Sequence, residues 1–297
     1  MVSERLFSFA GQHVRVAFMQ QHNADADLLP SFGVFAVEHG VGEHELLFSL
    51  VVDDDAVVPA AETTPIRNFD TGNGFTDVRV LPDGGYQFRI DNIEGQHCCL
   101  LQTDRSFRNC RCALRGSLLN RRYGLNNAMM LIFAFAGAAR GLMLVHASCV
   151  EHEGRGYAFI AKSGTGKSTH SGLWMSNIPG TTLLNDDNPV IRIDDSGVWL
   201  CGSPWSGKTP CYRNREVPLG AVVRIERAPS NAISREAPVA AFASLLPACS
   251  SMKWDGPLFN ALCDDVSHVV ERVPVFTLQC LPDDAAAVLC HSVVSAV

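Results

Sequence analysis

Lysine is nearly missing from this sequence, which contains only four lysines among its 297 residues. None of the four lies in the first 115 residues, where nine arginines and sixteen acidic residues give a net charge of −7. The rest of the chain is balanced, with fifteen basic and fifteen acidic residues. Neither part has the excess of basic side chains that binding to nucleic-acid phosphates requires, so we expect no nucleic-acid partner.

A long apolar run is also missing. The longest apolar stretch, Met129–Ala139, is too short to cross a bilayer and is followed by Arg140. The first residues include an acidic side chain and an arginine before any apolar run of signal-peptide length. We therefore expect a soluble, cytoplasmic protein with no membrane partner.

The spacing of the cysteines lacks the patterns of disulfide frameworks and zinc sites. Eleven cysteines are present, but no C-x-x-C pair occurs, and the close pairs are Cys98-Cys99 and Cys110-x-Cys112. An odd number of scattered cysteines in a chain of this length is typical of reduced thiols in a cytosolic protein. The sequence therefore favours free cysteines over a metal site.

The residues that are present predict two domains. Hydrophobic residues make up 47% of the chain, and a length of 297 residues suits two domains or one large one. Residues 1–115 contain short alternating segments such as Val14–Phe18 and Tyr86–Ile90, separated by turn-forming residues. These features predict a β-rich domain, as an antiparallel meander or a small barrel, without a catalytic motif. We expect its acidic run, Asp53–Asp55, to be a solvated loop.

Residues 116–297 have the pattern of an α/β domain, in which a mixed sheet is flanked by helices and a ligand binds at the strand ends. The apolar stretch Leu125–Leu144 predicts a buried helix. Later segments predict two strands, Tyr157–Ala161 and Pro274–Cys280, and three helices, Val239–Leu246, Pro257–Val270 and Asp283–Val294.

A phosphate-binding loop follows the first of these strands. Glycines at 164 and 166 allow the backbone to curl so that its N–H groups converge on phosphate oxygens. Lys167 supplies a positive charge for the β- and γ-phosphates, and the Ser168 hydroxyl can bind Mg²⁺. The predicted nucleotide-binding residues are Ser163, Gly164, Thr165, Gly166, Lys167, Ser168 and Thr169.

One position departs from the usual G-x-x-x-x-G-K-[ST] pattern, because Ala161 stands where its first glycine would be. Alanine is a small change at the end of a strand. The order of strand, loop and helix still favours a nucleotide-binding loop over a turn that contains Lys-Ser by chance.

Two neighbouring carboxylates provide the second part of the expected site. Asp186 and Asp187 are the last two residues of a short, mainly apolar predicted strand, Thr182–Asp187. One carboxylate can bind the metal while the other accepts a proton from an attacking hydroxyl, although Asp-Asp-Asn-Pro is also good turn chemistry. Because the two carboxylates occur together with a phosphate-binding loop, we favour a role in metal binding and proton transfer over a polar turn.

The part of the chain that contains the loop and the carboxylates resembles a known superfamily. The segments VHASCVEHEGRGYAFIAKSGTGKST and LLNDDNPVIRIDDSGVWLCGSPWSGK, followed by VPLGAVVRIERA, are similar to the core shared by HPr kinase/phosphorylase and ATP-dependent phosphoenolpyruvate carboxykinase. The resemblance covers about residues 145–227. It implies an α/β P-loop kinase core with ATP and Mg²⁺ as cofactors, preceded by a β-rich domain that resembles neither family.

The resemblance also implies a role for each matching residue. Lys167 matches the phosphate-loop lysine and Ser168 the metal-binding hydroxyl. Asp186 matches the general base of HPr kinase, and Asp187 the metal-binding aspartate of the carboxykinase. His146 matches a histidine near the transferred phosphate in both families. From the residues alone, which of the two aspartates is the base and which the metal ligand stays open.

A second Gly-Lys element, Ser203–Lys208, uses one of the four lysines. We predict that Lys208 stabilises charge on the transferred phosphoryl group, although a hairpin loop with a solvated lysine would look the same. Arg213 and Arg215 follow closely, and the sequence leaves open whether they bind an anionic group of the acceptor.

The predicted function is therefore an ATP- and Mg²⁺-dependent kinase, with Asp186, Lys167, His146 and Lys208 as catalytic residues and Ser168 and Asp187 at the metal. Its acceptor is a hydroxyl on a small alcohol such as serine, or a seryl side chain of a peptide or protein. Two alternatives stay open: carboxykinase chemistry on oxaloacetate, and a nucleotide-binding regulatory module without phosphotransfer. The sequence also leaves open whether the chain forms a homo-oligomer.

Overall fold

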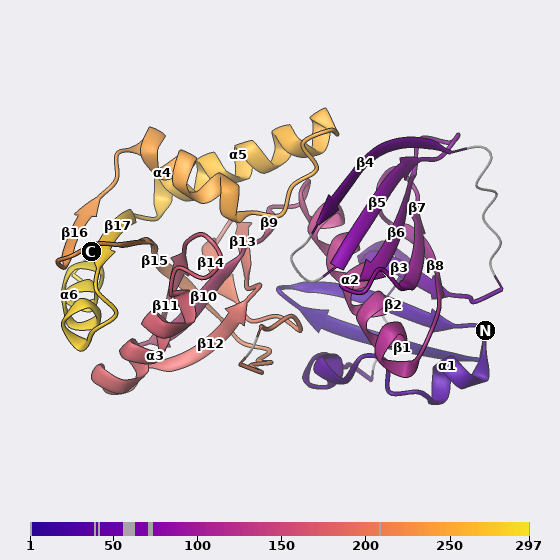
Figure 1. Cartoon of the computed structure of the whole chain (residues 1–297), viewed down its shortest axis with the longest axis horizontal. Helices are drawn as coiled ribbons and strands as arrows, with labels where there is room; N and C mark the ends of the chain where they lie inside the picture. The colour runs from indigo at the N-terminus through magenta and orange to yellow at the C-terminus, as the bar shows by residue number, and fades with distance from the viewer. Residues whose placement is uncertain are drawn as a thin grey trace. The chain divides into compact units, whose positions relative to one another are not determined.

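The computed structural model describes residues 2–38, 40, 42–55, 63–70, 74–207 and 209–296, and Figure 1 shows their secondary structure. The chain divides into two compact units, Met1–Ala136 and Gly137–Val297, here called the first and second units. The sequence places the domain boundary at residue 115, whereas the first unit extends through nearly all of helix α2 (Leu118–Gly137). The second unit contains every described residue predicted to act in catalysis or nucleotide binding.

The first unit is built on an eight-stranded sheet with the order β1-β2-β3-β8-β7-β6-β5-β4. Its strands are β1 (Ser3–Phe9), β2 (Gln12–Phe18), β3 (Leu46–Val52), β4 (Thr64–Asp70), β5 (Gly74–Val80), β6 (Tyr86–Asn92), β7 (His97–Thr103) and β8 (Asn109–Leu114). Strands β4 to β8 pair antiparallel in sequence order, but β3 runs parallel to both β2 and β8. The sheet is therefore mixed, and the prediction of an antiparallel meander or barrel is wrong around β3.

Parallel pairing of β2 and β3 requires a crossover, because the end of one strand lies far from the start of the next. The crossover contains α1 (Gln21–Asp25) and two short 3₁₀ helices, Pro30–Phe35 and Glu43–Glu45. Aromatic residues of this segment enter the core: Phe32 packs on Phe7, with 5.2 Å between ring centroids. No local pattern in the sequence predicts such a crossover, because it depends on which strands pair.

Helix α2 packs in the core of the first unit. Phe133 stacks on Phe9 with 4.7 Å between the ring centroids, and Phe135 contacts Phe107 at 5.4 Å. The predicted helix over Leu125–Leu144 was right in kind but wrong in its limits, because Leu142–Leu144 forms strand β9. Gly141, which directly precedes β9, has a left-handed φ of 69°, and the chain turns there into the strand.

The start of α2 is tied to the acidic run. Arg121 forms an ion pair with Asp54, whose carboxylate also accepts the backbone N–H of Leu114 at 2.9 Å. These contacts, with a side-chain hydrogen bond from Asn23, hold the pKa of Asp54 below its usual range against the opposing effect of burial. Asp54 is therefore a partly buried anchor, and the prediction of a solvated loop is wrong for this residue.

The second unit contains a nine-stranded mixed sheet, whose main order is β12-β10-β11-β15-β14-β13-β9, with β17 also paired to β15 and β16 paired to β17. Its strands are β9 (Leu142–Leu144), β10 (Ala147–His152), β11 (Arg155–Ile160), β12 (Thr182–Asp187), β13 (Val190–Asp194), β14 (Gly197–Cys201), β15 (Glu216–Arg227), β16 (Ala232–Arg235) and β17 (Val275–Cys280). Strands β11, β15 and β17 are parallel, so their carboxyl ends lie at one edge of the sheet.

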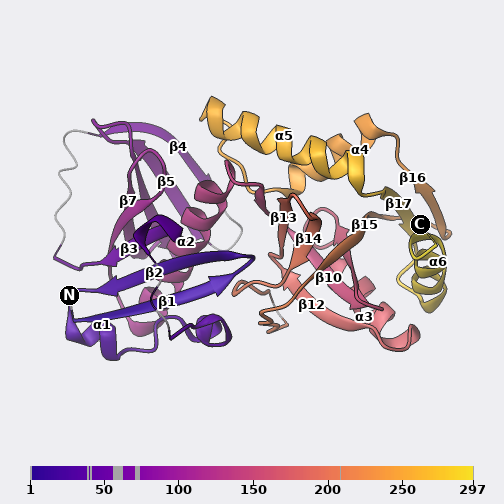
Figure 2. The same cartoon turned by 180° about the vertical axis from the view of Figure 1, so that it is seen from behind.

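Helices cover both faces of this sheet, and Figure 2 shows them in a view turned by 180° from that of Figure 1. They are α3 (Lys167–Asn177), α4 (Pro238–Leu245), α5 (Gly256–Arg272) and α6 (Asp284–Val294), with a 3₁₀ turn at Leu246–Ala248. One buried cluster joins the sheet to α4 and α5 and includes Ile160 and Val266. The other joins it to α3 and α6 and includes Phe159 and Trp174. The predicted α/β class, a mixed sheet flanked by helices, is confirmed.

The cysteines are free, and ten of the eleven are buried. Burial raises the pKa of several of these thiols, among them Cys149 and Cys249. A helix able to cross a membrane is not found in the described part of the chain.

Candidate functional site

The candidate site lies at the edge where the parallel strands of the second unit end. Strand β10 runs antiparallel to β11 and β12, and its first residue, Ala147, is paired with both Ile160 and Asp187. The pairing brings three segments that are distant in sequence to one place: the residue before β10, the loop after β11 and the carboxylates at the end of β12. These are the segments that carry His146, Lys167 and the two aspartates.

The loop between β11 and α3, residues 161–166, is here called the glycine-rich loop. Gly164 has φ 75° and Gly166 has φ 126°, both in the region that favours glycine. An added Cβ would meet nothing closer than 4.0 Å at either position, so the backbone conformation, and not crowding, requires glycine there. The first N–H groups of α3 lack acceptors within the helix and carry the positive end of its dipole.

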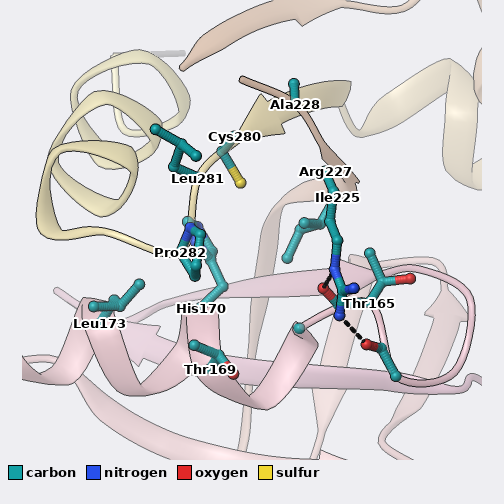
Figure 3. A pocket seen from close by; sticks show the side chains of 12 residues that line it. Thr165, Thr169, His170, Leu173, Ile225, Arg227, Ala228, Cys280, Leu281 and Pro282 are labelled. Atoms are coloured by element: carbon teal, nitrogen blue, oxygen red, sulfur yellow. Dashed lines mark hydrogen bonds between the residues drawn. The ribbon is translucent and has the colours of Figure 1, made fainter. Parts of the chain in front are cut away.

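Arg227, at the end of β15, holds the glycine-rich loop from one side (Figure 3). Its Nη2 donates to the carbonyl of Gly164 at 2.5 Å and its Nε donates to that of Thr165 at 3.1 Å. In a trans peptide the N–H points opposite to the C=O, so the N–H of Gly166 is directed away from Arg227. The contact therefore helps to turn a backbone donor toward the opposite side of the loop.

Helix α3 is fixed to the sheet beneath it by buried contacts. The Ser171 hydroxyl hydrogen-bonds that of Ser148 on β10 at 2.6 Å. Trp174 is fully buried against Tyr157 and Phe159 of β11, with ring centroids 5.1 Å and 5.4 Å apart. A helix held this firmly keeps Lys167 and Ser168, its first two residues, at a set position on the edge of the sheet.

Lys167 is buried at the start of α3, and its Nζ donates to Nε2 of His146 at 2.8 Å and to the carbonyl of Ala161 at 3.4 Å. Burial lowers the pKa of Lys167, while the charges of Asp187 and Asp186 act in the opposite direction. The ammonium group is thus held among acceptors in a place where an anionic ligand would relieve the cost of its desolvation.

His146 connects Lys167 to Asp187. A protonated lysine can only donate, so Nε2 of His146 accepts and the hydrogen of the neutral ring lies on Nδ1. That nitrogen lies 3.2 Å from Oδ1 of Asp187, and the second oxygen of Asp187 accepts from the Asn188 side chain at 2.8 Å. The three side chains therefore form a chain of close polar contacts, here called the Lys–His–Asp chain.

The backbone of Asp187 is strained. Its φ of 139° lies in a region that residues other than glycine rarely adopt. An isolated bridge to Ser206, the close contact with His146 and a hydrogen bond from the Asn188 side chain hold it there. Strain of this kind is often found at functional sites, where the surrounding structure maintains it.

Asp186 contacts the helix directly. It is only 4% exposed, and its Oδ1 accepts the hydroxyl of Ser168 at 2.8 Å. The donor set of Ser168, Asp186 and Asp187 consists of oxygen atoms only, which suits a hard cation such as Mg²⁺. Among the described residues, no group of three or more His, Cys, Asp or Glu side chains is arranged to bind a metal, so phosphate and water oxygens would have to complete the coordination.

The segment after β14 supports the end of β12. The backbone N–H of Gly207 donates to the carbonyl of Asp186 at 2.5 Å, and the Ser206 hydroxyl donates to the same carbonyl at 3.1 Å. Asn185 reaches back from β12 and donates to the carbonyl of Trp205 at 3.1 Å. Lys208, predicted as a catalytic residue in this segment, lies outside the described residues.

The two arginines that follow are placed away from the site. Arg215 forms an ion pair with Glu151, and Arg213 donates to the Thr182 hydroxyl at 3.2 Å. Glu151 and Thr182 are register partners at the end of β10 opposite to Ala147. The structure therefore gives no support to the suggestion that Arg213 and Arg215 bind an acceptor beside the carboxylates.

The structure brings together most of the residues that the sequence singled out. Lys167 hydrogen-bonds His146, whose other ring nitrogen lies 3.2 Å from Asp187, and Ser168 hydrogen-bonds Asp186. Ser163 to Gly166 form the adjoining loop, and Thr169 is exposed on the first turn of α3.

Several residues that support the site were missed from the sequence: Ser148, Asn185 and Arg227. Asn185 stands directly beside the predicted carboxylates, and Arg227 is the last residue but one of the quoted VPLGAVVRIERA segment, so position offered a hint. Their roles, however, depend on contacts between segments far apart in the chain.

A scan against protein-family models finds no match for this chain, and a search of curated proteins finds no similar sequence.

Proposed function

We propose that this protein is a Mg²⁺-dependent kinase that transfers the γ-phosphate of ATP to a hydroxyl group. The observation that carries the proposal is the meeting of Lys167, Ser168 and two carboxylates at the start of a helix that follows a glycine-rich loop. Positioning and charge stabilisation are most of what phosphoryl transfer asks of a protein, and this arrangement can supply both.

The phosphates would bind at the glycine-rich loop and the first turn of α3. Backbone N–H groups and the helix dipole favour an anion there. Lys167 adds a positive charge, which burial and its contact with His146 hold in place. In this role Lys167 neutralises charge that develops on the transferred group.

The oxygen atoms of Ser168 and Asp187 fit Mg²⁺ in their chemistry. When bound, the ion would draw the β- and γ-phosphate oxygens together and neutralise part of their charge. Ser168 belongs to the first turn of α3 and Asp187 to the end of β12, so the two elements would share the ion. His146 keeps the Asp187 carboxylate and the Lys167 ammonium oriented through its two ring nitrogens.

Asp186 is the proposed general base. Its carboxylate already accepts a hydrogen bond from the hydroxyl of Ser168, so its oxygen is placed to accept from a hydroxyl. In the reaction the acceptor oxygen forms a bond to the γ-phosphorus, the bond from that phosphorus to the bridging oxygen breaks, and ADP leaves. The acceptor proton moves to Asp186. The acceptor is a small alcohol such as serine, or a seryl side chain of a peptide or protein.

The test is to incubate the full chain with ATP labelled in the γ-phosphate and an extract of metabolites or peptides, and to identify labelled products by mass spectrometry. We expect a labelled phosphate ester with the wild type and at least a hundredfold less with Lys167→Ala. Arg215→Ala, which changes a surface ion pair at the other end of β10, is the matched control and should label normally.

Three outcomes would contradict the proposal. Equal labelling by wild type and Lys167→Ala would show that the glycine-rich loop is not the site. Tight ATP binding without any labelled product would favour a regulatory nucleotide-binding module. ATP-dependent release of CO₂ from oxaloacetate would favour carboxykinase chemistry.

A further inference from the structure

A cavity of about 510 Å³ lies beside the glycine-rich loop, as Figure 3 shows from close by. One wall is the loop with the first two turns of α3, and the other is formed by Ile225–Ala228 and Cys280–Pro282. These last two segments lie at and just beyond the carboxyl ends of β15 and β17. In the strand order they stand on the opposite side of β11 from β12, which carries the two aspartates.

The walls of this cavity are mainly apolar. Leu173, Ile225 and Leu281 line it together with Pro282, and Leu281 is 41% exposed at its rim. The charged side chain of Arg227 also lines it, but two of its nitrogens are engaged with carbonyls of the glycine-rich loop. A cavity of this size with apolar walls suits a flat, largely apolar group of a small ligand.

One polar ring faces this apolar space. His170 extends from α3 into the cavity toward Pro282 (Figure 3), and its residue is only 3% exposed. Its Nε2 accepts the indole N–H of Trp174 at 3.1 Å. Because an indole nitrogen can only donate, the hydrogen of the neutral His170 ring must be on Nδ1. Burial lowers the pKa of His170 to about 4, so the ring stays neutral near pH 7.

Within the described part of the chain, Nδ1 of His170 has no hydrogen-bond partner. This nitrogen is not among the fully buried polar atoms that lack a partner, so its N–H is accessible from the mainly apolar cavity. The N–H can therefore donate to an acceptor atom of a ligand that enters the cavity.

We propose that this cavity binds the nucleobase of the nucleotide, with the Nδ1–H of His170 donating to a ring nitrogen of the base. The proposal rests on the proposed function, because a triphosphate on the glycine-rich loop has two ends. Its γ-phosphate lies toward Lys167 and Asp186, so its α-phosphate, ribose and base extend to the other side of β11, where the cavity lies. The two-ring purines, which offer more apolar area than pyrimidines, are the favoured bases.

The test compares three ligands by isothermal titration calorimetry, each with Mg²⁺: ATP, UTP and inorganic tripolyphosphate. The proteins are the full-length wild type and the variants His170→Phe and Leu281→Gln. His170→Phe keeps an aromatic ring but removes the donor, and Leu281→Gln changes an exposed wall residue at similar size. The matched control is His291→Phe, since His291 also contacts Trp174, with 5.3 Å between the rings, but does not line the cavity.

For the wild type we expect ATP to bind at least tenfold more tightly than tripolyphosphate and more tightly than UTP. Each cavity variant should weaken ATP binding about three- to tenfold and leave tripolyphosphate binding unchanged, as the loss of one hydrogen bond or one apolar contact implies. His291→Phe should match the wild type with all three ligands.

The remaining outcomes separate the two proposals. Equal affinities of the wild type for ATP and tripolyphosphate would overturn the base site and leave the phosphate site intact. Unchanged ATP binding by both cavity variants would also overturn it, and would be the result if the cavity held the hydroxyl acceptor instead. Failure of the wild type to bind either ATP or tripolyphosphate would overturn the proposed function itself.

Discussion

Single residues at the site show how local chemistry and backbone geometry are coupled. In the Lys–His–Asp chain, the imidazole ring of His146 lies between the ammonium group of Lys167 and the carboxylate of Asp187. Its two nitrogens contact these groups and so fix their orientation. Asp187, at one end of this chain, has a backbone conformation better suited to glycine. At this position the side chain and the backbone thus have opposite preferences, which a pair of substitutions can separate.

We predict that Asp187→Gly is more stable to unfolding than Asp187→Ala by about 1 kcal/mol, because both lose the carboxylate but only glycine suits φ 139°. Neither variant should transfer phosphate at a measurable rate. Urea denaturation gives the free energies of unfolding. An alanine variant as stable as the glycine variant would show that the backbone is not strained.

His170 gives the second prediction at this scale. The pKa of His170 is about 4 in the folded protein and 6.5 when the chain is unfolded. Between pH 4 and pH 6.5 the unfolded chain therefore binds more protons than the folded one. Stability should therefore be complete above about pH 6.5 and decrease as the pH falls toward 4. The loss between pH 7 and pH 4.5 is about 2 kcal/mol.

The measurement is urea denaturation of wild type and His170→Gln at both pH values. Glutamine offers Trp174 an acceptor but does not titrate, so the decrease on going to pH 4.5 should be smaller in the variant by about 2 kcal/mol. The same decrease in both proteins would contradict the assignment of a neutral, buried His170.

At the scale of elements, the site depends on the contact between the end of β15 and the loop before α3. Arg227 is the side chain that makes it, through two loop carbonyls. It touches neither the carboxylates nor Lys167 in the described structure, so its effect must pass through the conformation of the loop.

We predict that Arg227→Ala raises the KM for ATP about three- to tenfold and changes kcat less, because the loop loses its ordering contact but the reacting groups remain. Arg227→Lys, which can still reach a carbonyl, should recover part of the loss. Steady-state kinetics against ATP concentration measure both. A variant with unchanged KM would show that the loop keeps its shape without Arg227.

The elements also show how far the sequence alone could lead. Strand β11, helix α3 and strand β12 were each predictable, because an apolar run, a Gly-Lys-Ser step and a strand ending in acids are local signals. The limits of α2 were not, since Met143 and its neighbours are as apolar as a helix interior and become a strand by pairing with β13. The parallel pairing of β3 with β2 and β8 was likewise not predictable, because no local sequence pattern distinguishes it from antiparallel pairing.

At the scale of the whole molecule, the chain divides into two compact units, each with its own buried hydrophobic residues. Helix α2 fills the core of the first unit through Phe133 and Phe135. The proposed nucleotide site belongs to the second unit. The sequence could separate a lysine-free β-rich region from an α/β region, but it could not place α2, because an apolar helix suits either core.

We predict that Phe133→Ala destabilises the first unit by about 3–5 kcal/mol, the usual cost of removing a buried phenylalanine. ATP binding by the second unit should be unchanged. Thermal unfolding of the full chain, followed with and without ATP, would then show a lowered transition that ATP does not shift and a second one that it does. A single transition lowered as a whole would show that the two cores unfold together.

We propose that the second unit transfers phosphate and does not merely bind nucleotide. Asp186→Asn tests it most directly, because the amide keeps the size of the side chain but cannot accept the proton of a hydroxyl. The measurement is transfer of the γ-phosphate of ATP to a hydroxyl acceptor, made beside ATP binding by calorimetry. We predict that the variant binds ATP within about threefold of the wild type and transfers phosphate at least a hundredfold more slowly. Equal rates of transfer by the two proteins, or no transfer by the wild type, would contradict the account.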